Sequence, residues 1–293
     1  MLLFALSCVA ADPPGEVLPR PDNVPVNLDA PADGIQITMG PYAVDPYTEE
    51  YLCEIQHVPE AEGLKVGALE HLTAPVGHHF NVFALLLEPE DGEMSGPCSE
   101  VWDNATMAFS SPVYASQTDS FRGDFPDGVA AEMPSAWFLL EYHVLNSGPG
   151  VETAKVFLNA YASDDWEHLA NGLYGNNTSI ELDPGETEVV TQVCPIEVDM
   201  ELFVLTSHSH ALNRKFEVLL DGEVIYESTD WDSPELMVLT DEPLSLRAGD
   251  ELEWRCHYDN DTDDTVTYGP ESDDEMCMLA GVYYPDQGFQ ICR

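Results

Sequence analysis

The sequence predicts an all-β protein made of two tandem antiparallel β-sandwich domains of jelly-roll type. Short apolar or alternating runs recur between turn signals from about Ile35 onward, and long stretches with helical periodicity are scarce. Asp221-Gly222 separates two such runs and is a typical hairpin signal. The length of 293 residues suits two domains of ordinary size.

The expected strands follow one another with turn residues between them. They cover residues 35–39, 82–87, 137–145, 156–160, 202–206, 216–220, 224–226, 251–254 and 279–284. A boundary near residues 163–165, or slightly later before 183–185, separates an N-terminal β domain of residues 35–165 from a C-terminal β domain of residues 166–293. Residues 12–34 are rich in Pro, Asp and Gly, which indicates a flexible tether.

The first residues resemble the end of a secretory signal, because the apolar run Leu2–Leu6 is followed by small residues. The segment 5–8 also resembles a loose lipobox, which would make Cys8 a lipid-anchored first residue. The alternative is that Cys8 belongs to a discarded signal, and both interpretations stay open. No later window of about 20 apolar residues is long enough to span a bilayer. A membrane contact is therefore expected only through Cys8.

The charge balance is strongly acidic, with 9 Lys+Arg against 55 Asp+Glu and a formal net charge of -46. Nucleic acids and anionic lipids are bound through clustered cations, so both are excluded as partners. The acidity is interpreted as a solvated surface that keeps the protein soluble in salt. The expected partners are a small-molecule substrate and O₂, and the chain is expected to be a monomer.

Six cysteines remain when Cys8 is set aside, and none forms a C-x-x-C pair. An even number without that motif favours disulfides in an oxidising compartment over a zinc site. The spacing alone allows 15 pairings. The cysteines therefore predict an exported protein, located in the periplasm, on the outer cell surface or secreted.

His208-Ser209-His210 follows the expected strand of residues 202–206. Side chains at positions i and i+2 of a strand point to the same face, so both imidazoles can bind one metal ion. Imidazole suits copper, zinc, iron and nickel, and the pattern alone does not select among them.

Three further candidate ligands have structural alternatives of their own. His78-His79 needs a bulge or a strand end to share a metal, and Gly77 makes such an irregularity plausible. His143 lies inside an apolar run, where a hydrogen-bonded core histidine is the alternative. Met276 would pass for a core methionine, although thioether is a soft ligand that favours Cu(I).

The ordered set His-His, a strand Tyr-His, His-x-His and Asp-Glu-Met-Cys resembles the copper type II, ascorbate-dependent monooxygenases. That family includes peptidylglycine α-hydroxylating monooxygenase and dopamine β-monooxygenase. The resemblance runs from about residue 51 to Cys292 and rests on the ligand segments, since the sequence between them is divergent. It implies two β domains that each carry one copper ion.

The resemblance assigns roles to individual residues. It implies a three-histidine electron-transfer copper site at His78, His79 and His143. It implies an O₂-activating copper site at His208, His210 and Met276. It also implies the disulfides Cys53–Cys98, Cys194–Cys292 and Cys256–Cys277.

The implied activity is hydroxylation of a C–H bond with O₂, using two copper ions per chain and ascorbate or another one-electron reductant. The alternative is a non-catalytic copper-binding lipoprotein or interaction protein that kept the ligands and lost the reaction. Presence of all six ligands favours the enzyme, because a binding protein needs only one site.

The sequence departs from the peptide-amidating relatives where these contact their substrate. The positions of their Arg, Asn and Tyr are Thr206, Met278 and Ala280 here. We therefore expect a neutral or apolar substrate rather than peptide amidation. Glu141 replaces a Gln near the third histidine and could place a charge near that copper. The remaining histidines, His57, His71, His168 and His257, match no ligand position and are expected to be structural or exposed.

Overall fold

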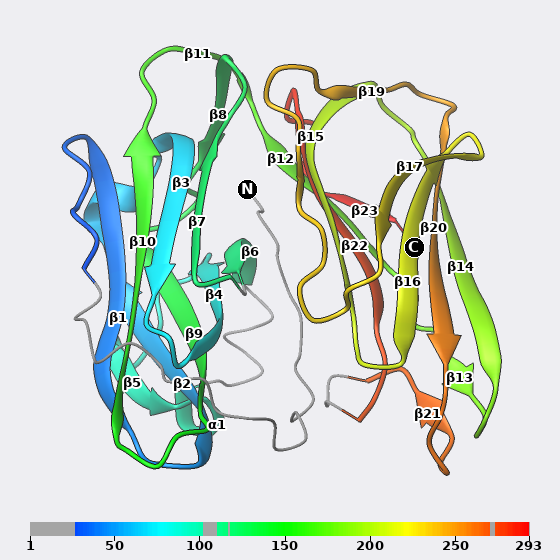
Figure 1. Cartoon of the computed structure of the whole chain (residues 1–293). Helices are drawn as coiled ribbons and strands as arrows, with labels where there is room; N and C mark the ends of the chain where they lie inside the picture. The colour runs from blue at the N-terminus through cyan, green and yellow to red at the C-terminus, as the bar shows by residue number, and fades with distance from the viewer. Residues whose placement is uncertain (1–26, 102–109, 117, 270–272, 293) are drawn as a thin grey trace. The chain divides into compact units, whose positions relative to one another are not determined.

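The computed structural model describes residues 27–101, 110–116, 118–269 and 273–292. Cys8 and the rest of the expected signal or lipoprotein-like segment up to residue 26 lie outside these residues. The chain divides into two compact units between Leu169 and Ala170. Figure 1 shows that both consist mainly of strands, so the all-β prediction is confirmed.

Helical structure in the described ranges comprises only the 3-10 turn η1 (Pro59–Ala61) and the single-turn helix α1 (Cys98–Val101). No helix in these ranges is long and apolar enough to cross a membrane.

The described residues of the N-terminal unit form two sheets. One has the strand order β1-β10-β3-β8-β11, with β7 also paired to β3, and the other has the order β5-β2-β9-β4-β6. The pairing is antiparallel throughout except between β8 and β11. The strands are β1 (Gly34–Val44), β2 (Thr48–His57), β3 (Lys65–Thr73), β4 (Gly77–Leu85), β5 (Met94–Pro97), β6 (Ser110–Ser116), β7 (Ser120–Asp124), β8 (Gly128–Glu132), β9 (Trp137–Asn146), β10 (Glu152–Ala162) and β11 (Trp166–Leu169).

Strand β9 shows why its sequence is a nearly continuous apolar run. It lies at the centre of its sheet between β2 and β4, and both of its faces are covered. Phe138, Leu140 and Tyr142 are fully buried on one face. On the other face, Leu139 packs with Ile55 and with Val101 of α1 in a small separate core. His143 belongs to this second face, by the alternation of side chains along a strand.

The C-terminal unit contains two larger sheets and a two-stranded one. Their strand orders are β18-β15-β22-β12-β23 with β19 also paired to β15, β14-β20-β16-β17, and β13-β21. Only β12 and β23 among these described strands pair in parallel. The strands are β12 (Asn171–Asn176), β13 (Glu181–Leu182), β14 (Thr187–Pro195), β15 (Met200–Ser209), β16 (Asn213–Leu220), β17 (Glu223–Ser228), β18 (Met237–Val238), β19 (Leu244–Leu246), β20 (Glu251–Asp259), β21 (Val266–Thr267), β22 (Cys277–Tyr284) and β23 (Gln290–Cys292).

One core cluster joins the two larger sheets of this unit. Strand β20 follows the period-2 rule closely, with Leu252, Trp254, Cys256 and Tyr258 buried and the residues between them less buried. The same cluster includes Leu205 of β15, so side chains of both sheets share one apolar core.

All the expected strands except one lie within observed strands. The run 82–87 ends as a strand at Leu85, and Leu86 and Leu87 are exposed. The units divide after Leu169, between the two boundary positions that the sequence offered, and β11 pairs with β8 of the N-terminal unit. The Asp221-Gly222 hairpin is confirmed between β16 and β17, with φ of 49° and 84° at the two turn residues, as a type I′ turn requires.

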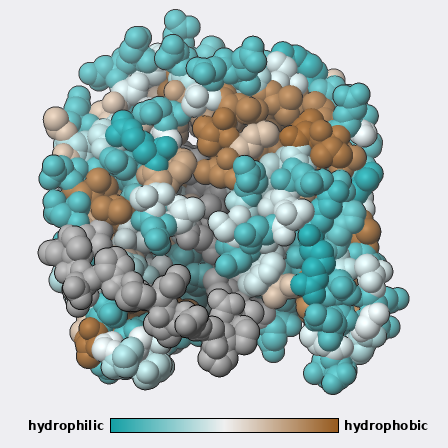
Figure 2. All heavy atoms as spheres, in the orientation of Figure 1, coloured by the Kyte–Doolittle hydropathy of each residue, from teal (hydrophilic) through white to brown (hydrophobic). Residues whose placement is uncertain are grey.

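The three disulfides are Cys53–Cys98, Cys194–Cys292 and Cys256–Cys277, which confirms the pairing implied by the resemblance. Each joins cysteines of a single unit, and three such bonds are typical of proteins in oxidising compartments. Figure 2 shows hydrophilic residues over most of the visible face, with apolar residues gathered in the upper part of the C-terminal unit.

Candidate metal centres

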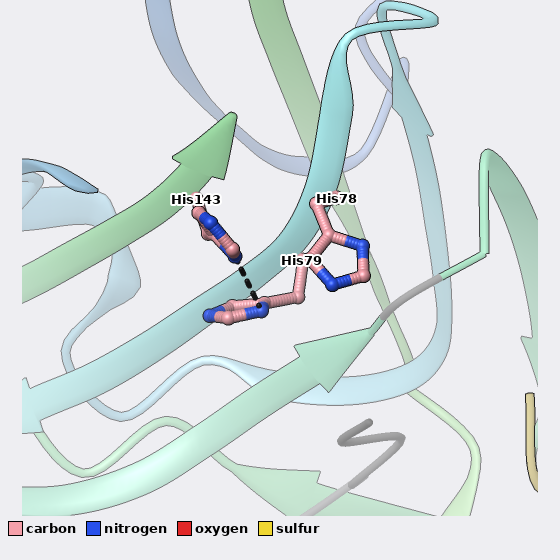
Figure 3. Close-up of side chains that lie close together, drawn as sticks. All are labelled: His78, His79 and His143. Carbon is pink, nitrogen blue, oxygen red and sulfur yellow. Dashed lines mark hydrogen bonds between the residues drawn. The ribbon is translucent and has the colours of Figure 1, made fainter. Parts of the chain in front are cut away.

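Three of the predicted ligands converge in the N-terminal unit. In the register of β2, β9 and β4, Tyr51 lies opposite His143, and His143 lies opposite His79. Residues paired in this way place their side chains on the same face of a sheet. Figure 3 shows the rings of His78, His79 and His143 grouped together. One ring nitrogen from each lies within 4.8 Å of the others.

A β-bulge brings the adjacent histidines to the same site. The register between β4 and β9 shifts between Gly77 and His79, so His78 does not point to the opposite face as it would on a regular strand. A Cβ atom at Gly77 would collide with Thr73 Oγ1 and the Tyr142 hydroxyl. Glycine at this position avoids that collision, and it lies at the irregularity that the sequence made plausible.

Two carboxylates lie against two of the rings, and one of them accepts a hydrogen bond from its ring. His143 donates its Nε2–H to Glu49 Oε1 at 2.8 Å, and His79 Nε2 lies 3.5 Å from Glu141 Oε1. A neutral imidazole that donates from Nε2 carries its lone pair on Nδ1. The two Nδ1 atoms face each other at 3.4 Å, the contact drawn in Figure 3. Two nitrogens bound to one ion at about 2.0–2.1 Å and a tetrahedral angle are separated by about that distance.

The environment of His78 and His143 favours their neutral forms. Burial, followed by the neighbouring His79, lowers the pKa of His78 to about 4. Burial and then the two other histidines lower the pKa of His143 to about 2. His78 Nε2 is buried without a hydrogen-bond partner, which is uncommon for a polar atom in a folded protein. Neutral, converging imidazoles with an orphaned nitrogen are the donor set that a copper ion would bind.

Tyr51 covers one side of this cluster. Its ring stacks on His143 with centroids 4.0 Å apart and planes inclined by 6°, and it meets His79 edge-on. Because Tyr51 remains partly exposed, the ring of His143 is separated from solvent by a single aromatic layer.

Cys53, Cys98 and Glu141 form a second close grouping of potential ligand types. The two cysteines are joined in a disulfide, so they offer no thiolate. Among the described residues, the three histidines therefore remain the candidate site of this unit.

The second predicted pair lies at the end of β15. His208 and His210 alternate with Ser207 and Ser209, and their ring centroids are 5.2 Å apart. Both rings are buried. His210 donates its Nδ1–H to the carbonyl of Asp274 at 2.9 Å, which leaves the lone pair on Nε2. Burial lowers the pKa of His210, although Asp274 opposes this effect.

Met276 is held next to this segment by its neighbours in the chain. Asp274, which accepts the hydrogen bond of the His210 ring, precedes it by two residues. The Tyr258 hydroxyl donates to the Met276 carbonyl at 2.7 Å, and Cys277 is bonded to Cys256. The backbone that carries the thioether is therefore fixed on both sides of Met276, which is itself partly buried.

The three substituted positions lie on the same sheet face as His208. Thr206 is paired with Ala280 and His208 with Met278, between β15 and β22. The Thr206 hydroxyl donates to the Glu235 carbonyl at 3.0 Å. The Thr206 side chain therefore holds the segment that carries Glu235 against β15.

The histidines without a predicted role lie outside the two candidate sites. His71 is buried between the Thr118 carbonyl, at 2.6 Å, and the Tyr114 hydroxyl. His57 stacks on Trp137, and His257 bonds to Glu217 at 2.7 Å. His168 lies in β11.

Sequence reasoning missed Glu49 and Asp274 as partners of the candidate ligands. Glu49 lies 94 residues from His143, and Asp274 contributes only its backbone carbonyl. No local pattern marks such contacts, because they depend on strand register and loop conformation. The contact of Glu49 could have been predicted only from the register in which Thr48–His57 pairs with Trp137–Asn146.

Residues 170–293 match the family model described as copper type II ascorbate-dependent monooxygenase, C-terminal domain. Among solved structures, the chain is similar to one described as "Structure of PNGF-II in P21 space group", at 10% identity and a TM-score of 0.26. That similarity covers 87% of this chain and 60% of the other. A score this low gives no basis for transferring a fold or a function.

Proposed function

The chain belongs to the copper type II ascorbate-dependent monooxygenase family through its C-terminal domain, and from this premise we propose that it is a copper-dependent monooxygenase. It hydroxylates a C–H bond of a small, neutral or apolar substrate with O₂. His78, His79 and His143 would hold one copper, and His208, His210 and Met276 would hold the other.

The convergence of His78, His79 and His143 carries this proposal. The family match covers only the C-terminal unit, so the histidine cluster of the N-terminal unit is an independent observation. A protein that merely binds copper needs one site. Two sites of different ligand softness suit an enzyme that must deliver two electrons, one from each site.

Copper, when bound, would supply the one-electron chemistry with O₂ that no side chain can perform. The protein supplies imidazoles whose orientation depends on neighbouring groups. Glu49 accepts the Nε2–H of His143, and the Asp274 carbonyl accepts the Nδ1–H of His210. Glu141 Oε1 lies 3.5 Å from His79 Nε2. Met276 would add a soft ligand that favours the reduced ion.

The face around His208 supports a substrate without a carboxylate. Met278 and Ala280 lie beside the candidate ligands, and Thr206 is already bonded to Glu235. Hydrogen-bonding groups on this face come from β12, where Asn176 is paired with Met278 and donates to the Tyr268 hydroxyl at 2.8 Å. Amide and phenol groups suit a neutral molecule better than an anion, so peptide amidation is not proposed.

Export is part of the same proposal. Three disulfides persist in oxidising compartments, such as the periplasm, the cell surface or the medium outside the cell.

The test is ascorbate-driven O₂ consumption by the copper-loaded protein, measured with a panel of small neutral substrates. We expect Met276→Ile and His210→Ala to lower the rate by at least tenfold while leaving the N-terminal site loaded. Equal rates for the wild type and both variants with every substrate would refute the proposed monooxygenase activity. Two bound coppers without any turnover would favour the alternative, a non-catalytic copper-binding protein.

A further inference from the structure

Glu275 is a fully buried carboxylate placed between two candidate copper ligands. Its relative exposure is 0%, and it directly precedes Met276 in the chain. Its Oε2 accepts the backbone N–H of His210 at 2.9 Å and that of Met276 at 3.1 Å. Its Oε1 accepts the backbone N–H of Leu212 at 2.7 Å. One side chain therefore joins the main chain on both sides of the site.

Burying the Glu275 carboxylate costs free energy that packing alone would not require. Removing a carboxylate from water is strongly unfavourable unless hydrogen bonds compensate, and an apolar residue of similar size avoids that penalty. Its bonds go to main-chain N–H groups, which hold backbone segments rather than neutralise charge. The segments it holds carry His210 and Met276, so we look for its role in their geometry.

We propose that Glu275 is a positioning residue, which sets the separation between the backbone of His210 and that of Met276 so that imidazole and thioether reach one copper ion. The inference rests on the proposed function, since it assumes that His208, His210 and Met276 bind copper. Two neighbouring contacts act in the same sense: the His210 ring bonds to the Asp274 carbonyl, and the Tyr258 hydroxyl bonds to the Met276 carbonyl. Those contacts fix each ligand locally, whereas Glu275 connects the two.

Replacement by glutamine has a defined consequence. Glu275→Gln keeps one acceptor oxygen and turns the other into an NH₂ group, which faces an N–H donor and cannot accept from it. Whichever way the amide lies, either the contact with Leu212 or the contacts with His210 and Met276 are lost. Removing a group that orients a metal ligand usually lowers metal affinity by about 10–100-fold.

The experiment is a Cu(I) competition titration in the full chain carrying His78→Ala and His143→Ala, so that the C-terminal site is read alone. We expect Glu275→Gln to weaken binding at least tenfold. The matched control is Glu217→Gln, a buried glutamate of the same unit whose partners are Lys215 and His257. This control should keep wild-type affinity.

X-ray absorption of bound Cu(I) supplies a readout that general destabilisation does not change. We expect the sulfur contribution of Met276 to weaken or disappear in Glu275→Gln and to persist in Glu217→Gln. If Glu275→Gln does not fold, Glu275→Asp tests the same idea, because it keeps the charge but withdraws the carboxylate by one methylene; we expect the same loss of affinity and of sulfur.

A folded Glu275 variant with wild-type affinity and an intact sulfur signal would overturn the positioning role alone. Equal loss of affinity in Glu217→Gln would overturn it too, by showing a general effect. Failure of the starting variant to bind any Cu(I) would instead refute the proposed C-terminal copper site itself.

Discussion

The two candidate sites are held in different ways. In the N-terminal unit, the rings are supported by side chains on the same sheet face, since Glu49 accepts a hydrogen bond from His143 and Glu141 lies 3.5 Å from His79. In the C-terminal unit, ligands are oriented through the backbone, because the Asp274 and Met276 carbonyls take part in the contacts and a disulfide adjoins Met276. Side-chain support can be altered one group at a time, whereas backbone support depends on the loop as a whole. The comparison predicts different sensitivities to mutation.

The largest difference is expected from the disulfide beside Met276. Cys256→Ala with Cys277→Ala removes a bond between residues 21 apart in sequence, which should lower the free energy of unfolding of the C-terminal unit by about 3 kcal/mol. We expect the C-terminal copper to be lost and the N-terminal copper to stay. Denaturant unfolding and metal analysis measure both effects.

The control for that pair is Cys194→Ala with Cys292→Ala, which removes a disulfide of the same unit whose cysteines do not adjoin a candidate ligand in the chain. It should destabilise the unit without selective loss of copper from the remaining folded protein. Equal copper loss in the two pairs would contradict a special role of the bond at Cys277.

The next effect is expected at the bulge of the N-terminal site. In Gly77→Ala the new methyl group collides with Thr73 and Tyr142, so the unit should lose about 1–3 kcal/mol and its copper. Gly150→Ala is the matched control, since a Cβ there meets nothing within 4 Å. Thermal unfolding and copper analysis check this prediction, and a Gly77→Ala protein with normal copper content would argue against the bulge as the device that joins His78 to His79.

A smaller effect is expected from the supporting carboxylates. Glu49→Gln and Glu141→Gln each replace an anionic acceptor beside a candidate ligand, and copper affinity of the N-terminal site should fall about tenfold. Glu50→Gln is the control, because Glu50 lies on the opposite face of β2, paired with Val144. Unchanged affinity in both variants would show that the rings are held without these carboxylates.

The smallest predicted difference concerns pH in the metal-free protein. The unfolded chain binds protons on histidine below about pH 6.5, whereas folded His78 and His143 do so only below about 4 and 2. The stability of the N-terminal unit should therefore fall as pH drops from 6.5 towards 4.

In the C-terminal unit, His210 and Glu275 have opposite effects on how stability changes with pH. The pKa of His210 is lowered by burial, but burial raises that of Glu275 to about 7, and this carboxyl contributes stability at low pH that is lost as pH rises from 4.5 through 7. Melting curves at pH 7 and pH 5 should show the larger loss in the N-terminal unit. An equal or larger loss in the C-terminal unit would contradict these pKa directions.

Several features of the fold and of the candidate sites depend on local sequence. Alternation in Glu251–Asp259, the Asp221-Gly222 turn and the glycine before His78 each act within a few residues, so the strands, a hairpin and the bulge could be predicted. The disulfide pairing could be predicted only through the family resemblance, since spacing allows 15 solutions.

What could not be predicted depends on contacts between distant segments. The bond of Glu49 to His143 needs the register of β2 and β9, and the burial of Glu275 needs the loop after β15 to meet the one before β22. The exposure of Leu86 and Leu87 likewise follows from where β4 stops pairing. Local composition carries no signal for any of these.

The central claim is that each unit binds its own copper. The most direct measurement is the copper content of three purified proteins: wild type, His78→Ala with His143→Ala, and His208→Ala with His210→Ala. We predict two coppers per chain in the wild type and one in each double variant, lost from a different unit each time. No bound copper in the wild type, or two in either double variant, would contradict the assignment.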